Sequence, residues 1–148
     1  MKGITTALAL TLVLATIEAE ENVKAKIAKV FNTCKEKNPV TEDEIGAFRK
    51  ADIGFSYSHD AKCMLACMLE EGKMLRDGKY MKENALIMAD VFHIDDFDEA
   101  AKARKVIENC AIEVPEVGPD PCEFAFKMAV CGANESKKLG MKDHDFFE

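Results

Sequence analysis

Six cysteines are the residues of this chain with the clearest chemistry. Cysteine thiols can oxidise in pairs to disulfides, and cysteine thiolates can bind a metal ion such as zinc. The compartment decides between these uses, because disulfides persist in oxidising surroundings and free thiols in reducing ones. The six all follow residue 33: Cys34, Cys63, Cys67, Cys110, Cys122 and Cys131.

The start of the chain has the pattern of a secretory signal peptide. Met1 and Lys2 give a positive start, residues 4–15 form an apolar run too short to span a bilayer, and Ala19 offers a small residue for cleavage. We therefore expect residues 1–19 to be a signal peptide and residues 20–148 to form one helical domain with a C-terminal tail from about residue 133. The mature protein is expected to be secreted and extracellular, where cysteines pair.

Helix geometry limits which cysteines can pair. Six cysteines allow 15 pairings. Cys63 and Cys67 lie four residues apart on one predicted helix, in orientations poorly suited to bonding each other. Cys122 and Cys131 lie nine residues apart on another, so their backbones are roughly 13 Å apart and beyond disulfide reach. These two exclusions leave ten pairings, and the residues alone choose no further.

A metal site is the alternative use of the same residues. His59, Cys63 and Cys67 recur every four residues along one predicted helical face, which could supply three zinc ligands. In an exported chain the disulfide interpretation is favoured, because oxidised sulfur is a poor ligand and the C-x3-C step has no matching second half. The acidic residues around Asp95 and Asp96 lack the alternating ligands and central glycine of a calcium-binding EF-hand. We expect no metal and no cofactor.

The first helices that must position these residues follow from apolar spacing and capping residues. An apolar stripe from Val23 to Cys34 predicts the first helix. Thr41 followed by Glu44 is a capping box that opens a second helix, which runs to about residue 50. Ser58 caps a third helix, which reaches residue 71. A turn at residues 77–78 then leads to a fourth helix over about 81–92.

Two further helices complete the domain. Asp95 and Asp96 precede a fifth helix that runs to about residue 112. Asp120 as cap, Pro121 at the first helical position and Gly132 past the last turn delimit a sixth. The sixth is apolar nearly all round, so we expect it to be buried, with a cysteine on each side linked to opposite neighbours. The predicted fold is all-α, a compact disulfide-braced bundle of about six helices.

The spacing of the cysteines resembles that of the six-cysteine odorant-binding proteins of insects, which include pheromone-binding and general odorant-binding proteins. Successive cysteines are separated by 28, 3, 42, 11 and 8 residues, with C-x3-C and C-x8-C steps, and the resemblance covers the chain from Cys34 to Cys131. It implies the pairs Cys34–Cys67, Cys63–Cys122 and Cys110–Cys131, which are among the ten. It also implies a carrier that takes odorants or pheromones through aqueous lymph to chemosensory receptors.

A disulfide-braced shell can enclose an apolar cavity, because covalent tethers hold helices apart that would otherwise pack together. The residues expected to bind a ligand are apolar, and Met side chains in particular adapt to ligands of different shape. They are Ile27, Phe31, Phe55, Leu65, Leu69, Met74, Leu75, Met81, Met88, Phe92, Ile107, Phe124, Met128, Phe146 and Phe147. Hydroxyls such as those of Tyr57, Ser58 or Tyr80 are expected to supply selectivity.

The C-terminal tail carries two apolar residues at its end, Phe146 and Phe147. Burying a Phe is favourable by roughly 1.5 to 3 kcal/mol. One hypothesis is that the tail folds over the cavity mouth, with His144 making closure sensitive to pH. The other is that this end is frayed. Asn134 begins a glycosylation sequon, which we expect in an unmodified surface loop.

Charge and motif content bear on the remaining classes of partner and function. The net charge of −7 disfavours nucleic acid and anionic membranes. No second apolar stretch approaches the roughly 20 residues of a membrane helix, so stable membrane insertion is not expected. The three histidines are scattered and no nucleophile elbow or phosphate loop is present, which disfavours an enzyme.

A saposin-like lipid-interacting module and a non-olfactory carrier remain as alternatives. The expected partners are a small hydrophobic molecule (an odorant, a pheromone or a fatty-acid-like compound) and a chemosensory receptor, and a homodimer stays open.

Overall fold

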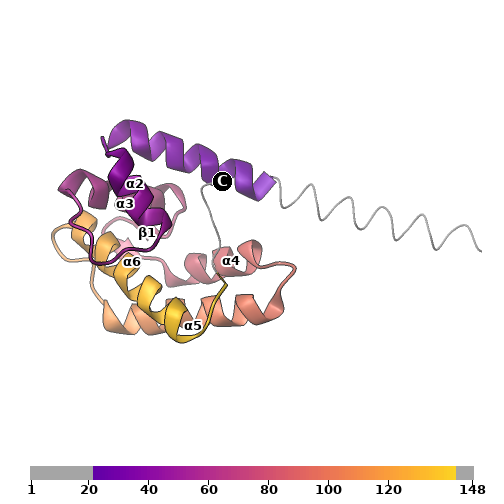
Figure 1. Cartoon of the computed structure of the whole chain (residues 1–148). Coiled ribbons are helices and arrows are strands. Elements are labelled where there is room, and N and C mark those ends of the chain that lie inside the picture. The colour runs from indigo at the N-terminus through magenta and orange to yellow at the C-terminus, as the bar shows by residue number, and fades with distance from the viewer. Residues whose placement is uncertain (1–21, 143–148) are drawn as a thin grey trace, which may run out of the picture.

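The computed structural model of the protein describes residues 22–142, which contain six helices and one small hairpin (Figure 1). Residues 22–37 are helical and are called the N-terminal helix below. The elements that follow are α2 (Glu42–Arg49), α3 (His59–Glu71), β1 (Leu75–Arg76), β2 (Lys79–Tyr80), α4 (Lys82–Phe92), α5 (Phe97–Glu113) and α6 (Pro121–Lys138). The all-α bundle expected from the sequence is confirmed.

Four of the predicted helix starts are confirmed, and each is capped by the side chain of the residue that precedes the helix. The Thr41 hydroxyl accepts from the Glu44 amide while the Glu44 carboxylate accepts from the Thr41 amide, which completes the capping box of α2. Ser58 accepts from the Ala61 amide at the start of α3. Asp96 and Asp120 cap α5 and α6 in the same way. In each case the capping side chain and the amide that donates to it lie within three residues of each other, so the sequence pattern contains both.

A short antiparallel hairpin stands where the sequence predicts only a turn. Leu75 pairs with Tyr80 and Arg76 with Lys79. The two residues between the strands, Asp77 and Gly78, both have positive φ (51° and 70°). Asp-Gly with two positive φ values is the usual loop of a two-residue hairpin, because it matches the twist of the flanking strands. The hairpin places Leu75 in the core and Tyr80 half-buried against it.

α6 is longer than the sequence predicts. The expected end at Gly132 is wrong: the helix continues to Lys138, and residues 133–138, assigned to the tail from the sequence, belong to it. The last turns are held by Glu135, which is buried and accepts hydrogen bonds from Asn109 of α5 and from Lys138, each at 2.6 Å. A helical glycine costs about 1 kcal/mol, which these contacts offset. The Asn134 sequon therefore lies on a helix and not in a loop.

Three disulfides tie four of the helices together. Cys34 of the N-terminal helix is bonded to Cys67 of α3, Cys63 of α3 to Cys122 of α6, and Cys110 of α5 to Cys131 of α6. These are the pairs that the family resemblance implies. α6 is thus linked near its start to α3 and in its middle to α5, as expected for a helix with a cysteine on each side.

The core is divided into two small clusters and is rich in alanine. Ala66, Leu75, Phe124 and Ala125 form one cluster, and the two half-cystines Cys34 and Cys67 with Met64 form the other. Seven of the fifteen buried apolar residues are alanines, so helices approach closely where these residues meet. The N-terminal helix lies at the top of Figure 1 and α5 at the bottom. Most larger apolar side chains are only partly buried, and many of them face the cavity described next.

Candidate functional site

One cavity of about 820 Å³ lies among the N-terminal helix, α3, the hairpin, α4, α5 and α6. Its volume is within the range of roughly 300 to 1,000 Å³ that is typical of small-molecule sites. Most of its wall is apolar. Eight of the residues expected from the sequence line it: Ile27, Leu65, Leu69, Met74, Met88, Phe92, Ile107 and Met128.

The other residues predicted to bind ligand lie elsewhere. Phe31 packs against the cluster around Cys34, and the Phe55 ring lies 5.0 Å from that of Tyr57. Leu75 and Phe124 are 4% and 2% exposed and belong to the core. Met81 precedes α4, where its amide donates to the Met74 carbonyl. The remaining two, Phe146 and Phe147, lie outside the described residues, as does His144.

Several lining residues are not among those expected. Val23 and Val30 could have been found, because they share the apolar stripe of the N-terminal helix with Ile27. Gly132 also lines the cavity, and a Cβ added there would meet no atom within 4 Å. The other lining residues that were not expected are Lys26, Lys29, Thr33, Met68, Glu71, Gly72, Lys73, Val91, Val106, Cys110, Ala125 and Ala129.

Of the three hydroxyls expected to give selectivity, Tyr80 lines the cavity. Its ring lies 5.8 Å from that of Phe124, and burial raises its pKa, so the hydroxyl stays neutral and can donate a hydrogen bond. Tyr57 instead donates to the Asp52 carbonyl and stacks on Phe48, with ring centroids 4.3 Å apart. Ser58 caps α3.

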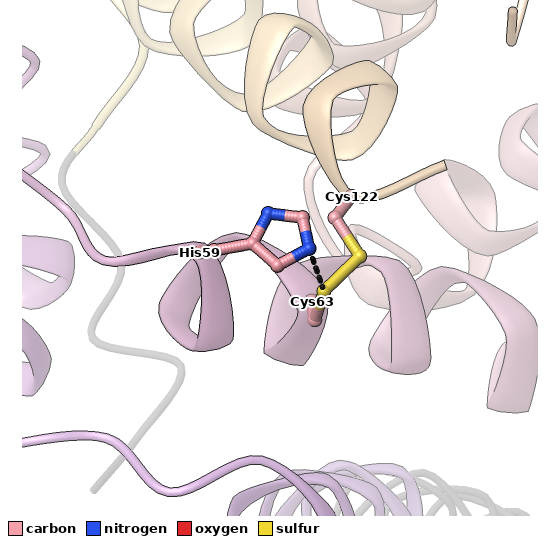
Figure 2. Close-up of side chains that lie close together, drawn as sticks. All are labelled: His59, Cys63 and Cys122. Atoms are coloured by element: carbon pink, nitrogen blue, oxygen red, sulfur yellow. Dashed lines mark hydrogen bonds between the residues drawn. A yellow bond between two sulfur atoms is a disulfide. The ribbon is translucent and has the colours of Figure 1, made fainter. Parts of the chain in front are cut away.

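The predicted preference for disulfides over zinc agrees with the surroundings of His59. Figure 2 shows the His59 ring beside the Cys63–Cys122 bond, with Nε2 3.4 Å from the Cys63 sulfur. Cys67 is bonded to Cys34. Neither Cys63 nor Cys67 therefore offers a thiolate, and the set of three proposed zinc ligands is reduced to one exposed imidazole.

The acidic residues around the start of α5 are used within the protein. Asp96 caps α5 and pairs with Lys142 at 2.6 Å. Glu99, which is 1% exposed, accepts from Lys102 and from the Lys142 amide. The bond from Lys102 lowers the pKa of Glu99 and keeps it ionised. These contacts hold residues 140–142 against α5.

Within residues 22–142, none of the helices combines the length and the apolar character that crossing a membrane requires.

Comparisons with known proteins agree with the cysteine pattern and the fold. Among curated proteins, none matches the chain significantly. Among solved structures, the chain is similar to the odorant-binding protein dmelOBP28a from Drosophila melanogaster. The two have 25% sequence identity and a TM-score of 0.66, and the match covers 83% of this chain and 99% of the other. The family model of the PBP/GOBP family matches residues 17–135, which is most of the chain. This protein therefore belongs to the PBP/GOBP family.

Proposed function

We propose that the protein is a secreted carrier that binds small hydrophobic molecules, keeps them in solution and delivers them to chemosensory receptors. The observation that carries this proposal is the apolar cavity of about 820 Å³ in a member of the PBP/GOBP family. The structurally similar protein dmelOBP28a is named as an odorant-binding protein, which supports the same role here. The ligand is released without chemical change, so the proposed activity is binding and not catalysis.

Secretion is part of the proposal and is supported by two features. The leader-like residues 1–19 fit an export signal. All six cysteines are oxidised in the structure, and disulfides persist outside the reducing cytosol.

Transfer of apolar surface from water drives binding in such a cavity. Each Å² of ligand surface removed from water contributes roughly 25 cal/mol, against which the loss of ligand freedom must be set. The Met side chains, here Met68, Met74, Met88 and Met128, can change rotamer to fit different outlines. The wall therefore suits a range of apolar ligands, with Tyr80 as a hydrogen-bond donor.

Gly132→Leu tests the proposal, because Gly132 lines the cavity and has room for an added Cβ. An added Cβ at Gly132 meets no atom within 4 Å, and a mid-helix leucine is favoured over glycine by roughly 0.5 to 1 kcal/mol. We expect the variant to be at least as stable as the parent and to bind a fluorescent phenylnaphthylamine probe roughly tenfold more weakly, because the leucine side chain takes up cavity volume that the ligand would otherwise fill. Fluorescence titration measures the affinity and thermal denaturation the stability.

Gly46→Leu is the matched control. Gly46 is also a mid-helix glycine with no atom within 4 Å of an added Cβ, but it lies on α2, away from the cavity. This variant should gain similar stability and keep the parent's affinity. Equal affinity in both variants, or no saturable probe binding by the parent, would contradict the proposed cavity.

The role of the C-terminal residues is a separate part of the proposal. We propose that Phe146 and Phe147 contribute to ligand binding, since a buried Phe is favourable by roughly 1.5 to 3 kcal/mol. Deleting residues 143–148 retains the contacts of Lys142 with Asp96 and Glu99, so the fold should persist. We expect roughly tenfold weaker probe binding. The same affinity in the truncated and full-length chains at pH about 5 and about 7.5 would refute this role.

A further inference from the structure

The cavity lining has a surplus of positive charge although the chain as a whole is acidic. Lys26 and Lys29 line it from the N-terminal helix, and Lys73 lines it from the segment after α3. The chain carries a net charge of −7. Three cations from two separate parts of the fold therefore line one cavity of a protein whose net charge is negative.

The structure holds these lysines in place at the backbone. Lys26 and Lys29 are three residues apart on the helix whose apolar stripe, Val23, Ile27 and Val30, also lines the cavity. Lys73 follows the end of α3 with a positive φ of 58°, and its carbonyl accepts a 2.7 Å hydrogen bond from the Asn84 amide group. Their positions at the cavity are thus set by the fold.

The three charges are not neutralised by the protein. Within residues 22–142, Lys26, Lys29 and Lys73 make no ion pair. The acidic residue of the lining, Glu71, is paired with Lys37, with the ammonium 2.9 Å from the carboxylate. Six other lysines of residues 22–142 do have a carboxylate partner, among them Lys62 with Glu123 and Lys142 with Asp96.

Such lysines can contact both the apolar chain and the charged head of an amphiphile. A lysine lays its four-carbon stem along apolar surface and keeps its ammonium in water, so the stems extend the apolar wall while the charges lie at its edge. All three side chains are exposed, which places their ammonium groups at the rim and not in the interior. A charged head at this rim and an alkyl chain along the Met and Leu wall would meet complementary surfaces at once.

We propose that the preferred ligand is a single-chain amphiphile with an anionic head, of which a long-chain carboxylate is the simplest, with its head at Lys26, Lys29 and Lys73. This inference rests on the proposed carrier function and names its ligand class. A neutral alcohol of the same chain length has the same tail but carries no charge that the lysines could attract. An amine is positively charged and is repelled by the lysines.

The first test compares dodecanoate, dodecanol and dodecylamine as competitors of the phenylnaphthylamine probe at pH about 8, where the carboxylate is ionised. We expect dodecanoate to bind roughly tenfold more tightly than dodecanol, the size expected from one or two exposed charge pairs, and dodecylamine to bind most weakly. The preference should decrease as salt rises from about 0.02 M to about 0.5 M, since salt screens exposed charges. Dodecanol binding should not change in this way.

The second test changes the lysines. The triple variant Lys26→Gln, Lys29→Gln, Lys73→Gln should lose the preference for dodecanoate and keep its affinity for dodecanol. The control is Lys50→Gln, Lys79→Gln, Lys137→Gln, which changes the net charge equally at exposed lysines outside the cavity lining. The control should keep the parent's preference.

The outcomes separate the two proposals. Equal affinity for dodecanoate and dodecanol in the parent, or an unchanged preference in the cavity variant, refutes the anionic ligand class while the carrier function stands. Equal loss of preference in both triple variants assigns it to net charge and also refutes the role of these lysines. If neither the probe nor any of the three competitors binds saturably, the carrier function itself is refuted.

Discussion

Replacing Cys63 and Cys122 together by alanine should lower the free energy of unfolding by about 4 kcal/mol. The two half-cystines are 59 residues apart, the largest separation among the three disulfides, and they join α3 to α6. A crosslink restricts the unfolded chain more when it closes a longer loop. Urea denaturation at neutral pH, followed by helical circular dichroism, measures the change.

The pair Cys110 and Cys131 provides the comparison. These residues are 21 apart, and their double alanine variant should cost about 3 kcal/mol by the same loop-entropy relation. Both variants remove the same atoms and leave two disulfides. A larger loss in the short-loop variant would show that local packing, and not loop closure, dominates the contribution of these bonds.

Glu44→Gln should destabilise the protein by about 2 to 3 kcal/mol at neutral pH, because it removes a buried charged acceptor. Glu44 is 5% exposed and links two helices: one carboxylate oxygen accepts from the Thr41 amide and hydroxyl at the start of α2, and the other accepts from the Ser58 amide at the start of α3. Burial alone would raise the pKa of Glu44. The hydrogen bonds from Ser58 and Thr41 outweigh burial and lower the pKa from 4.5 to about 2.

The sign of the pH dependence follows from this shift. Because the pKa is lower in the folded state, the unfolded chain binds more protons between pH 4.5 and about 2, and the stabilisation by Glu44 is lost as pH falls through that window. The parent should therefore approach the stability of Glu44→Gln as pH decreases. Denaturation at pH about 7, 4 and 2.5 tests this convergence.

Glu42→Gln is the matched control on the same helix. The side chain of Glu42 is 84% exposed and pairs with Lys35, which lowers its pKa. Exposed pairs contribute little, so this change should leave stability nearly unaltered at every pH tested. A loss as large as that of Glu44→Gln would mean that net charge, and not the link between α2 and α3, is the cause.

Features that depend on neighbours in the chain were predictable from the sequence. Ser58 and Asp120 cap helices through amides two or three residues away, so their patterns carry the necessary information. The end of α6 was not predictable in this way, because Glu135 holds it through Asn109, which is 26 residues distant. Gly132 gave the wrong stop because its cost is offset by this tertiary contact.

The assignment of apolar residues to core or cavity shows the same limit. Phe92 and Phe124 look alike in helical patterns, yet one lines the cavity and the other is in the core. Only the packing of α6 against α3 and of α4 against α5 separates them. Similarly, the residues left ten disulfide pairings open, and the family resemblance supplied the pairing that the structure has. Lys73 reaches the cavity only through the turn after α3, so no local pattern marks it.

Three disulfides join the helices and seven alanines lie buried in the core, whereas the cavity is lined mainly by larger, half-buried side chains. Changes of size or shape in the lining therefore leave the contacts between helices intact. Gene duplicates of such a chain can diverge in what they recognise while inheriting the same framework. Natural variation in this lineage should accordingly concentrate on positions such as Met88 and Ile107, and spare positions such as Ala61 and Ala66.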